Sequence, residues 1–176
     1  MRIIAGTHRG HRIAAPKGRD TRPTGDRVRE AAFNLIGPVD GAEVLDLYAG
    51  SGAMGLEALS RGAERTTFVE ADQQAAATIQ RNLEKLRLTG ARIVRDDAAR
   101  ALAAEGAAGR KYDLVLVDPP YDDYLELQPM LARYLPPLLS DDALVVVETS
   151  VRIEPELPLE LRTSRKYGSA RLTLFG

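Results

Sequence analysis

From residue 43 onward, short apolar runs alternate with segments of helical periodicity, and this alternation constrains the fold more than any other feature of the 176-residue chain. We predict strands for five of these runs, at residues 43–49, 66–71, 91–95, 112–118 and 143–149. Helical patterns at residues 53–61, 98–105 and 124–134, and from 72 to near 90, fill the intervals, so successive strands should run parallel. Residues 160–175 instead predict a hairpin that turns at Gly168-Ser169. The expected fold is α/β, with helices on both faces of a seven-stranded, mostly parallel sheet and an antiparallel hairpin at its C-terminal edge.

The first forty residues differ from the rest in charge. Residues 1–36 contain eight Arg and Lys against three acidic residues, a net +5, while the remainder carries 16 basic and 22 acidic residues, a net −6. A hairpin pattern at residues 2–14 and a helical pattern at 26–36 are too small for an independent domain. We therefore divide the chain into a basic extension (residues 1–40), hereafter the arm, and a larger domain (residues 41–176). The arm is either a polyanion-binding surface or a solvated polar segment.

Composition excludes several classes of function. The chain has no cysteine, which rules out disulfides, thiolate metal sites and thiol catalysis. Both histidines, His8 and His11, lie in the arm, so neither a histidine metal centre nor a Ser-His-Asp relay is expected. No apolar stretch has the length of a bilayer span, and no apolar segment follows Met1-Arg2 as in a signal peptide. We expect a cytoplasmic monomer with no bound metal and no membrane contact.

A glycine-rich loop follows the first predicted strand. Gly50, Gly52 and Gly55 have G-x-G-x-x-G spacing, and Glu70 lies 20 positions after the first of them, at the end of the second strand. Such glycines permit a tight turn and close approach of backbone to a ligand, and the acidic residue can accept hydrogen bonds from ribose hydroxyls. The pattern indicates a nucleotide-type cofactor but does not separate NAD from other adenosine cofactors, and a turn without a ligand is the alternative.

Two further carboxylates favour S-adenosylmethionine over NAD. Asp46 precedes the glycine turn, where an anion suits a cationic sulfonium and amino group but not a pyrophosphate. Asp97 follows the third strand and can accept from an adenine amino group, even if it also caps the next helix. With both histidines in the arm, no residue remains for hydride chemistry. The predicted cofactor residues are Asp46, Tyr48, Gly50, Ser51, Gly52, Glu70, Ala71, Asp97, Ala98 and Asp118.

The D-P-P-Y sequence at residues 118–121 ends the most apolar strand and points to the chemistry. The Asp118 carboxylate and the Pro119 carbonyl can accept both protons of an exocyclic base amine, which localises the nitrogen lone pair for attack on a methyl group. Tyr121 can stack on the extruded base. A strand-ending turn with a surface tyrosine is the alternative. The predicted catalytic residues are Asp118, Pro119, Pro120 and Tyr121.

Residues 46–52 and 118–121 together resemble the class I S-adenosylmethionine-dependent methyltransferases that act on exocyclic amines. The arm, through residues 1–6, 21–24 and 26–34, closely resembles the RsmD-type methyltransferases, and the likeness covers nearly the whole chain. This resemblance implies a Rossmann-like class I fold. It also implies an enzyme of ribosome maturation that places one methyl on a guanine N2 of bacterial 16S ribosomal RNA, in the small subunit or a late assembly intermediate.

Arginines of the arm are the candidate contacts to RNA phosphates: Arg9, Arg12, Arg22, Arg27 and Arg29. Basic residues of the C-terminal hairpin, residues 162–171, can extend that surface. Two other functions stay open. One is an adenine-N6 methyltransferase of DNA or RNA, although an arm of this size leaves little room for a target-reading domain. The other is an S-adenosylmethionine-binding assembly factor without turnover, which would have no need of D-P-P-Y.

Overall fold

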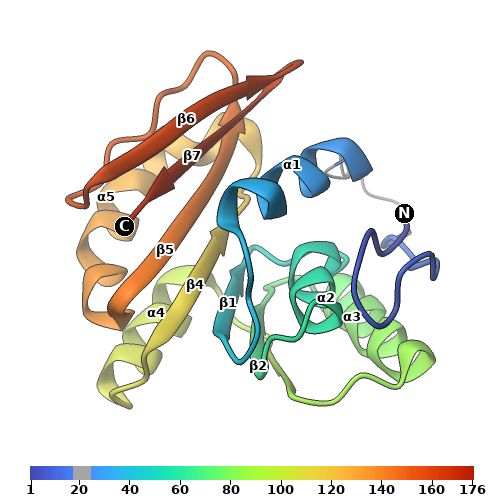
Figure 1. The fold of residues 1–176 in the computed structure, drawn as a ribbon. Coiled ribbons are helices and arrows are strands. Elements are labelled where there is room, and N and C mark those ends of the chain that lie inside the picture. Colours follow the sequence, from blue (N-terminus) through green and yellow to red (C-terminus); the bar gives the residue numbers. More distant parts are fainter. Residues whose placement is uncertain (18–24) are drawn as a thin grey trace.

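A computed structural model describes residues 1–17 and 25–176, and in it a seven-stranded sheet lies between two layers of helices (Figure 1). The strand order is β3-β2-β1-β4-β5-β7-β6. The parallel strands are β1 (Glu43–Leu47), β2 (Arg65–Val69), β3 (Ala91–Val94), β4 (Tyr112–Val117) and β5 (Leu139–Ser150). The C-terminal hairpin of β6 (Leu161–Tyr167) and β7 (Ala170–Phe175) adds antiparallel to β5. The predicted sheet is therefore confirmed, with all seven strands.

The helices divide between the two faces of the sheet. One face carries α1 (Asp26–Ile36), α2 (Ala53–Ser60) and α3 (Gln73–Leu86), and the other carries α4 (Ala98–Ala107) and α5 (Tyr124–Tyr134). Short 3₁₀ turns, η1 (Tyr121–Asp123) and η2 (Pro136–Leu138), flank α5. Alternate residues of the central strands feed the two cores: Leu116 and Val146 pack toward α1, while Val117 and Val147 pack toward α4 and α5. Among the described residues, no helix is both long and apolar enough to span a bilayer.

Side-chain caps fix where two helices begin. Asp72 accepts a hydrogen bond from the Ala75 amide at 2.9 Å and starts α3. Asp97 accepts from the Arg100 amide at 2.8 Å and starts α4. Each carboxylate satisfies an amide that has no partner within its helix, so the polar residues after β2 and β3 determine the helix boundaries.

The order of the strands creates a crevice beside β1 and β4. The chain leaves β1 toward β2 on one side, and it leaves β4 toward β5 on the other. The two strands are adjacent and end in register, with Leu47 opposite Val117. Loops that leave neighbouring strands in opposite directions open a ligand crevice at the carboxyl ends, as is general for open α/β sheets. The glycine loop and the D-P-P-Y sequence are the two loops at this point.

The first seventeen residues pack onto α2 and α3. Arg2 and Arg12 form an isolated antiparallel bridge, so the predicted hairpin is present only as a short, irregular pairing. Ile3 and Ile13 are buried in the same apolar cluster as Leu56 of α2 and other residues of α2 and α3. The arm thus shares a core with the larger domain.

Candidate functional site: an acidic cavity at the switch point

A cavity of about 1100 Å³ lies at the carboxyl ends of the parallel strands. Most of the predicted site residues line it, from the loops after β1, β2, β3 and β4: Asp46, Tyr48, Gly50, Ser51, Glu70, Ala71, Asp97, Ala98, Asp118, Pro119 and Pro120. Gly52 does not line it but begins α2 in a left-handed conformation, with φ 81°. The side chain of Tyr121 lies outside what the structure describes, so its stacking role stays a prediction.

Glu70 holds the glycine loop in place. Its two carboxylate oxygens accept from the Gly50 amide at 2.9 Å and from the Asp72 amide at 3.0 Å. Gly50 has φ 58°, and a Cβ built on it would meet nothing within 4 Å. The loop therefore offers open space next to a fixed backbone and a buried carboxylate, which fits a ribose-containing ligand.

Gly55, the third glycine of the motif, serves packing. A Cβ at this position would lie 2.3 Å from the Phe68 ring and 2.9 Å from the Asp46 carboxylate. Its amide donates to Asp46 Oδ2 at 2.9 Å. The absence of a side chain thus lets α2 approach β1 and β2 closely, and the same contact orients the Asp46 carboxyl.

The cavity is strongly acidic. Burial raises the pKa of Asp46 well above its usual range; the Gly55 amide lowers it, while Asp118 and Glu70 raise it further. Among the described residues that line the cavity there is no Arg or Lys side chain. The acidic lining residues are Asp46, Glu70, Asp96, Asp97, Asp118, Asp122, Asp123 and Glu148. Such a field favours a cationic ligand and disfavours a pyrophosphate, which supports S-adenosylmethionine over NAD.

Tyr48 has an uncommon backbone conformation beside the cavity. Its φ is 62°, which is rare for a residue with a Cβ, and the residue lines the cavity. Burial, followed by the charges of Asp97 and Asp123, raises its pKa to about 12. Its side chain packs against the apolar core, and its buried hydroxyl has no hydrogen-bond partner among the described residues.

Glu148 is a cavity residue that the sequence analysis missed. It follows the β5 residue Val147, which pairs with Val117 of β4, so Glu148 within β5 lies beside Asp118, the first residue after β4. Glu148 is only 7% exposed. A glutamate directly after the run Val145-Val146-Val147 was the available signal, because a carboxylate continuing a buried strand requires a polar reason to be there.

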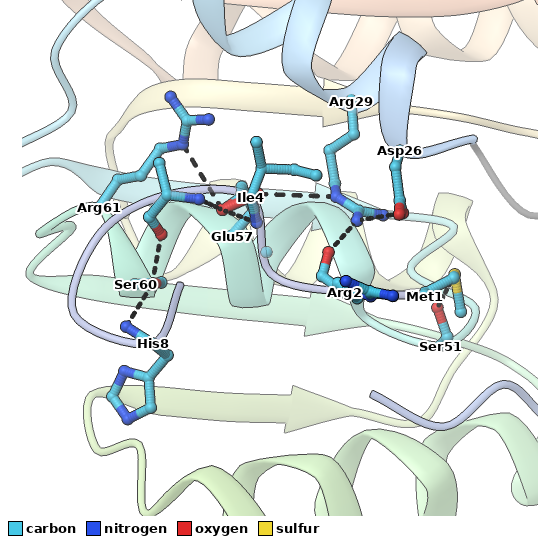
Figure 2. Close-up of polar contacts among 12 residues, drawn as sticks. Met1, Arg2, Ile4, His8, Asp26, Arg29, Ser51, Glu57, Ser60 and Arg61 are labelled. Carbon is cyan, nitrogen blue, oxygen red and sulfur yellow. Dashed lines mark hydrogen bonds and ion pairs between the residues drawn. The ribbon is translucent and has the colours of Figure 1, made fainter. Parts of the chain in front are cut away.

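The arm is fastened to α2 through Glu57 (Figure 2). Glu57 is fully buried and accepts from the Ile4 amide at 2.7 Å and the Ala5 amide at 3.3 Å. Its carboxylate also faces the guanidinium Nε atoms of Arg29 at 3.7 Å and of Arg61 at 3.5 Å. One buried carboxylate of α2 therefore binds both the first residues of the arm and the arm's helix α1.

The prediction that Arg29 contacts RNA is wrong. Arg29 has no exposed surface, it pairs with Asp26 at 2.8 Å and with Glu57, and it donates to the Arg2 carbonyl. Its guanidinium is paired with groups inside the protein and therefore cannot contact a phosphate. The hairpin residue Arg171 is also buried, bonded to Ser164 at 2.8 Å.

The other predicted arginines of the arm differ in whether their side chains are exposed in the described part of the chain. The side chains of Arg9, Arg12 and Arg27 are exposed, so all three stay candidates for phosphate contacts. Arg22 lies outside the described residues.

The arm also reaches the cavity, which the sequence analysis did not anticipate. Met1, Ala15 and Pro16 line its wall. The buried side chain of Asn82 in α3 accepts from the Ala14 amide at 2.9 Å and donates to the Ala14 carbonyl at 3.0 Å. The same Asn82 amide donates to the Ser51 carbonyl of the glycine loop at 3.1 Å. The arm and the cofactor loop are thus connected through one side chain.

Comparison with known proteins agrees with this architecture. The family model described as conserved hypothetical protein 95 matches residues 1–176. The chain is 40% identical to YlbH of Bacillus subtilis, over 99% of this chain and 98% of that protein. It is also 40% identical to ribosomal RNA small subunit methyltransferase D of Escherichia coli K12, over 86% of this chain and 75% of that protein.

Solved structures show the same fold. A hypothetical protein of Thermus thermophilus superposes with a TM-score of 0.86 and 32% identity, over 99% of this chain and 98% of that chain. The fold is the class I S-adenosylmethionine-dependent methyltransferase fold, as predicted. This chain belongs to the family described as conserved hypothetical protein 95.

Proposed function

We propose that the protein is an S-adenosylmethionine-dependent methyltransferase that places one methyl group on a guanine N2 of 16S ribosomal RNA in the small subunit. The observation that carries this proposal is that the glycine loop after β1 and the D-P-P-Y sequence after β4 open into one acidic cavity. A cofactor and a base held by these two loops would meet at the switch point of the sheet. The relative named for the small ribosomal subunit supports RNA as the substrate.

The cofactor half of the cavity is the side of β1, β2 and β3. In this proposal Glu70 binds the ribose hydroxyls, Asp97 the adenine amine and Asp46 the cationic methionine part, and the fact that all three line one cavity supports these roles. When bound, S-adenosylmethionine supplies an electrophilic methyl group. Burial, and then the charges of Asp118 and Glu70, raise the pKa of Asp46, and the positive charge of the cofactor's ammonium or sulfonium would offset these effects.

The base half is formed by Asp118 and Pro119. Together their oxygens would accept hydrogen bonds from both N–H groups of the base amine, which would leave the nitrogen lone pair free to attack the methyl group that a bound S-adenosylmethionine supplies. The sulfur would keep the electron pair of the carbon–sulfur bond, and the nitrogen would give up one proton to water. Pro119 is buried and its ring fixes φ, so its carbonyl has little freedom to move before the base arrives.

The experiment that tests this function is transfer of tritiated methyl groups to small ribosomal subunits from a strain that lacks the gene. Naked 16S RNA and duplex DNA run beside the subunits, and the labelled nucleoside is identified after digestion. We expect label in N2-methylguanosine. Label in N6-methyladenine would contradict guanine as the target base but would agree with methyl transfer to an exocyclic amine. Binding of S-adenosylmethionine without any label would favour an assembly factor without turnover.

A further inference from the structure

We propose that Glu148 selects guanine, by accepting a hydrogen bond from the N1–H of the target base while Asp118 and Pro119 hold its N2 amine. This inference rests on the proposed function and assigns a specificity-determining residue within it. Glu148 belongs to neither the glycine loop nor D-P-P-Y, and the sequence motifs give it no role.

The strand register places Glu148 beside Asp118. Val117 and Val147 are paired in the parallel β4–β5 ladder, so the residues that follow them are neighbours about 4.8 Å apart across the strands. Side chains alternate along a strand, and Leu116 and Val146, two positions before these carboxylates, both pack toward α1. Asp118 and Glu148 therefore project from the same face of the sheet, and both line the cavity.

The charge of the wall around Glu148 favours a base that presents hydrogen-bond donors. The Glu148 carboxylate is 7% exposed and lines the cavity together with Asp118. Glu148 already takes part in an interaction within the protein, and a carboxylate can accept several hydrogen bonds, so a donor from a base adds to that interaction. None of the described cavity-lining side chains is Arg or Lys, so this wall attracts the donor edge of a base and repels an acceptor edge.

Guanine has the donor pattern that two adjacent carboxylates accept. Its pairing edge presents N1–H beside the N2 amine, so an amine held at Asp118 directs N1–H toward the neighbouring strand, where Glu148 lies. Adenine has an amine beside an N1 lone pair, which would face the Glu148 carboxylate and be repelled. A hydrogen bond from N1–H to an anion also increases the electron density on N2, which assists attack on the methyl carbon.

The test uses 2-aminopurine, which keeps the amine at position 2 but has a lone pair at N1. The wild-type protein first identifies the guanine that it methylates, and 16S RNA is then ligated with guanine or 2-aminopurine at that position and reconstituted into subunits. The protein variants are Glu148→Gln and Glu64→Gln, the latter a matched loss of an exposed carboxylate at the opposite end of the sheet. Single-turnover methyl transfer and the Kd for S-adenosylhomocysteine are measured for each.

We expect the wild type and Glu64→Gln to methylate guanine at least about 10-fold faster than 2-aminopurine, the effect of one hydrogen bond to a charged group. In Glu148→Gln we expect methylation of guanine to fall by about 10-fold, because N1–H then donates to a neutral amide oxygen instead of to an anion. The guanine preference should shrink as well, because the glutamine amide can donate to N1 of 2-aminopurine. The Kd for S-adenosylhomocysteine should stay within about 3-fold of wild type, since a loss confined to the base leaves cofactor contacts intact.

Two results would overturn the inference: equal wild-type rates on the two bases, or an unchanged guanine preference in Glu148→Gln. The first needs no variant, so the test stands even if the substitution prevents folding. Failure of the proposed function is distinct, because it would already show in the first step, as wild-type protein that labels no guanine.

Discussion

Asp46 shows how a single buried residue can report cofactor binding. Its raised pKa means that the protein alone favours the neutral form, chiefly because of burial and then because of Asp118 and Glu70. A cationic ligand favours the charged form and lowers this pKa on binding. Binding should therefore release a proton at pH values between the two, and affinity should rise with pH across that interval.

We predict that S-adenosylmethionine binds more tightly as pH rises from the normal carboxyl range toward the raised pKa of Asp46. Titration calorimetry in two buffers of different ionisation enthalpy would measure the released protons. The variant Asp46→Asn should bind more weakly and release none through this group. Equal proton uptake or release in wild type and variant would contradict the assignment of Asp46 to the cationic part of the cofactor.

At the scale of elements, α2 joins the arm to the rest of the fold through Glu57. The carboxylate meets two arm amides and two guanidinium groups in a site where Glu57 and Arg29 have no solvent exposure. Removing one member of such a network leaves the others buried without compensation, which is more costly than loss of a surface pair.

We predict that Glu57→Gln lowers the free energy of unfolding by about 3 kcal/mol, the range for breaking a buried ion pair. Urea denaturation measures this change, and Glu64→Gln, an exposed substitution, should stay within about 0.5 kcal/mol of wild type. Limited proteolysis should also cut the arm faster in Glu57→Gln. An unchanged free energy of unfolding would show that the contacts around Glu57 do not stabilise the arm.

Elements with a strong local pattern were predicted closely. The bounds of α1 and α5 match the helical periodicity, and Pro119-Pro120 ends β4 as expected. The start of β5 was missed: residues 139–142 are mostly polar, and they pair with β4 across an irregularity after Tyr112. A strand that begins at an exposed, irregular part of the ladder has no apolar period to identify it.

Site residues within motifs were also predictable, whereas contacts between distant segments were not. Spacing predicts the glycine loop and Glu70, and the D-P-P-Y sequence at the end of an apolar strand predicts Asp118. Arg29 was placed at the surface because its charge matched its basic neighbours, and nothing near it in sequence shows that it packs on Glu57. The available signal was Glu57 itself, a lone charge among the apolar and small residues of α2.

The whole molecule separates its charges. The cavity is lined by carboxylates, whereas Arg9, Arg12 and Arg27 are exposed. These arginines belong to the first seventeen residues and to α1, segments that lie on the side of the sheet that carries α2 and α3 (Figure 1). Backbone phosphates of RNA would be repelled by the cavity and attracted to these arginines. A target base can enter an acidic cavity only if its phosphates are held elsewhere.

We predict that replacing Arg9, Arg12 and Arg27 with Gln weakens RNA binding and flattens its salt dependence. Each lost phosphate contact should reduce the slope of log K against log salt by about 0.7 to 0.9. Binding is measured by filter retention from about 50 to 300 mM KCl. A triple replacement of Arg65, Arg110 and Arg133, exposed elsewhere, is the control; an equal change there would mean that net charge alone sets the affinity.

In the proposed reaction, Asp118 acts on a base beside a cofactor that other residues hold. Its most direct test is to measure, for Asp118→Ala, the single-turnover rate of methyl transfer to small subunits together with the Kd for S-adenosylmethionine. We predict that transfer is nearly abolished while the Kd stays close to wild type, because the lost carboxylate contacts the amine. Unchanged transfer would remove Asp118 from the reaction, and loss of cofactor binding in step with transfer would assign it to the cofactor instead.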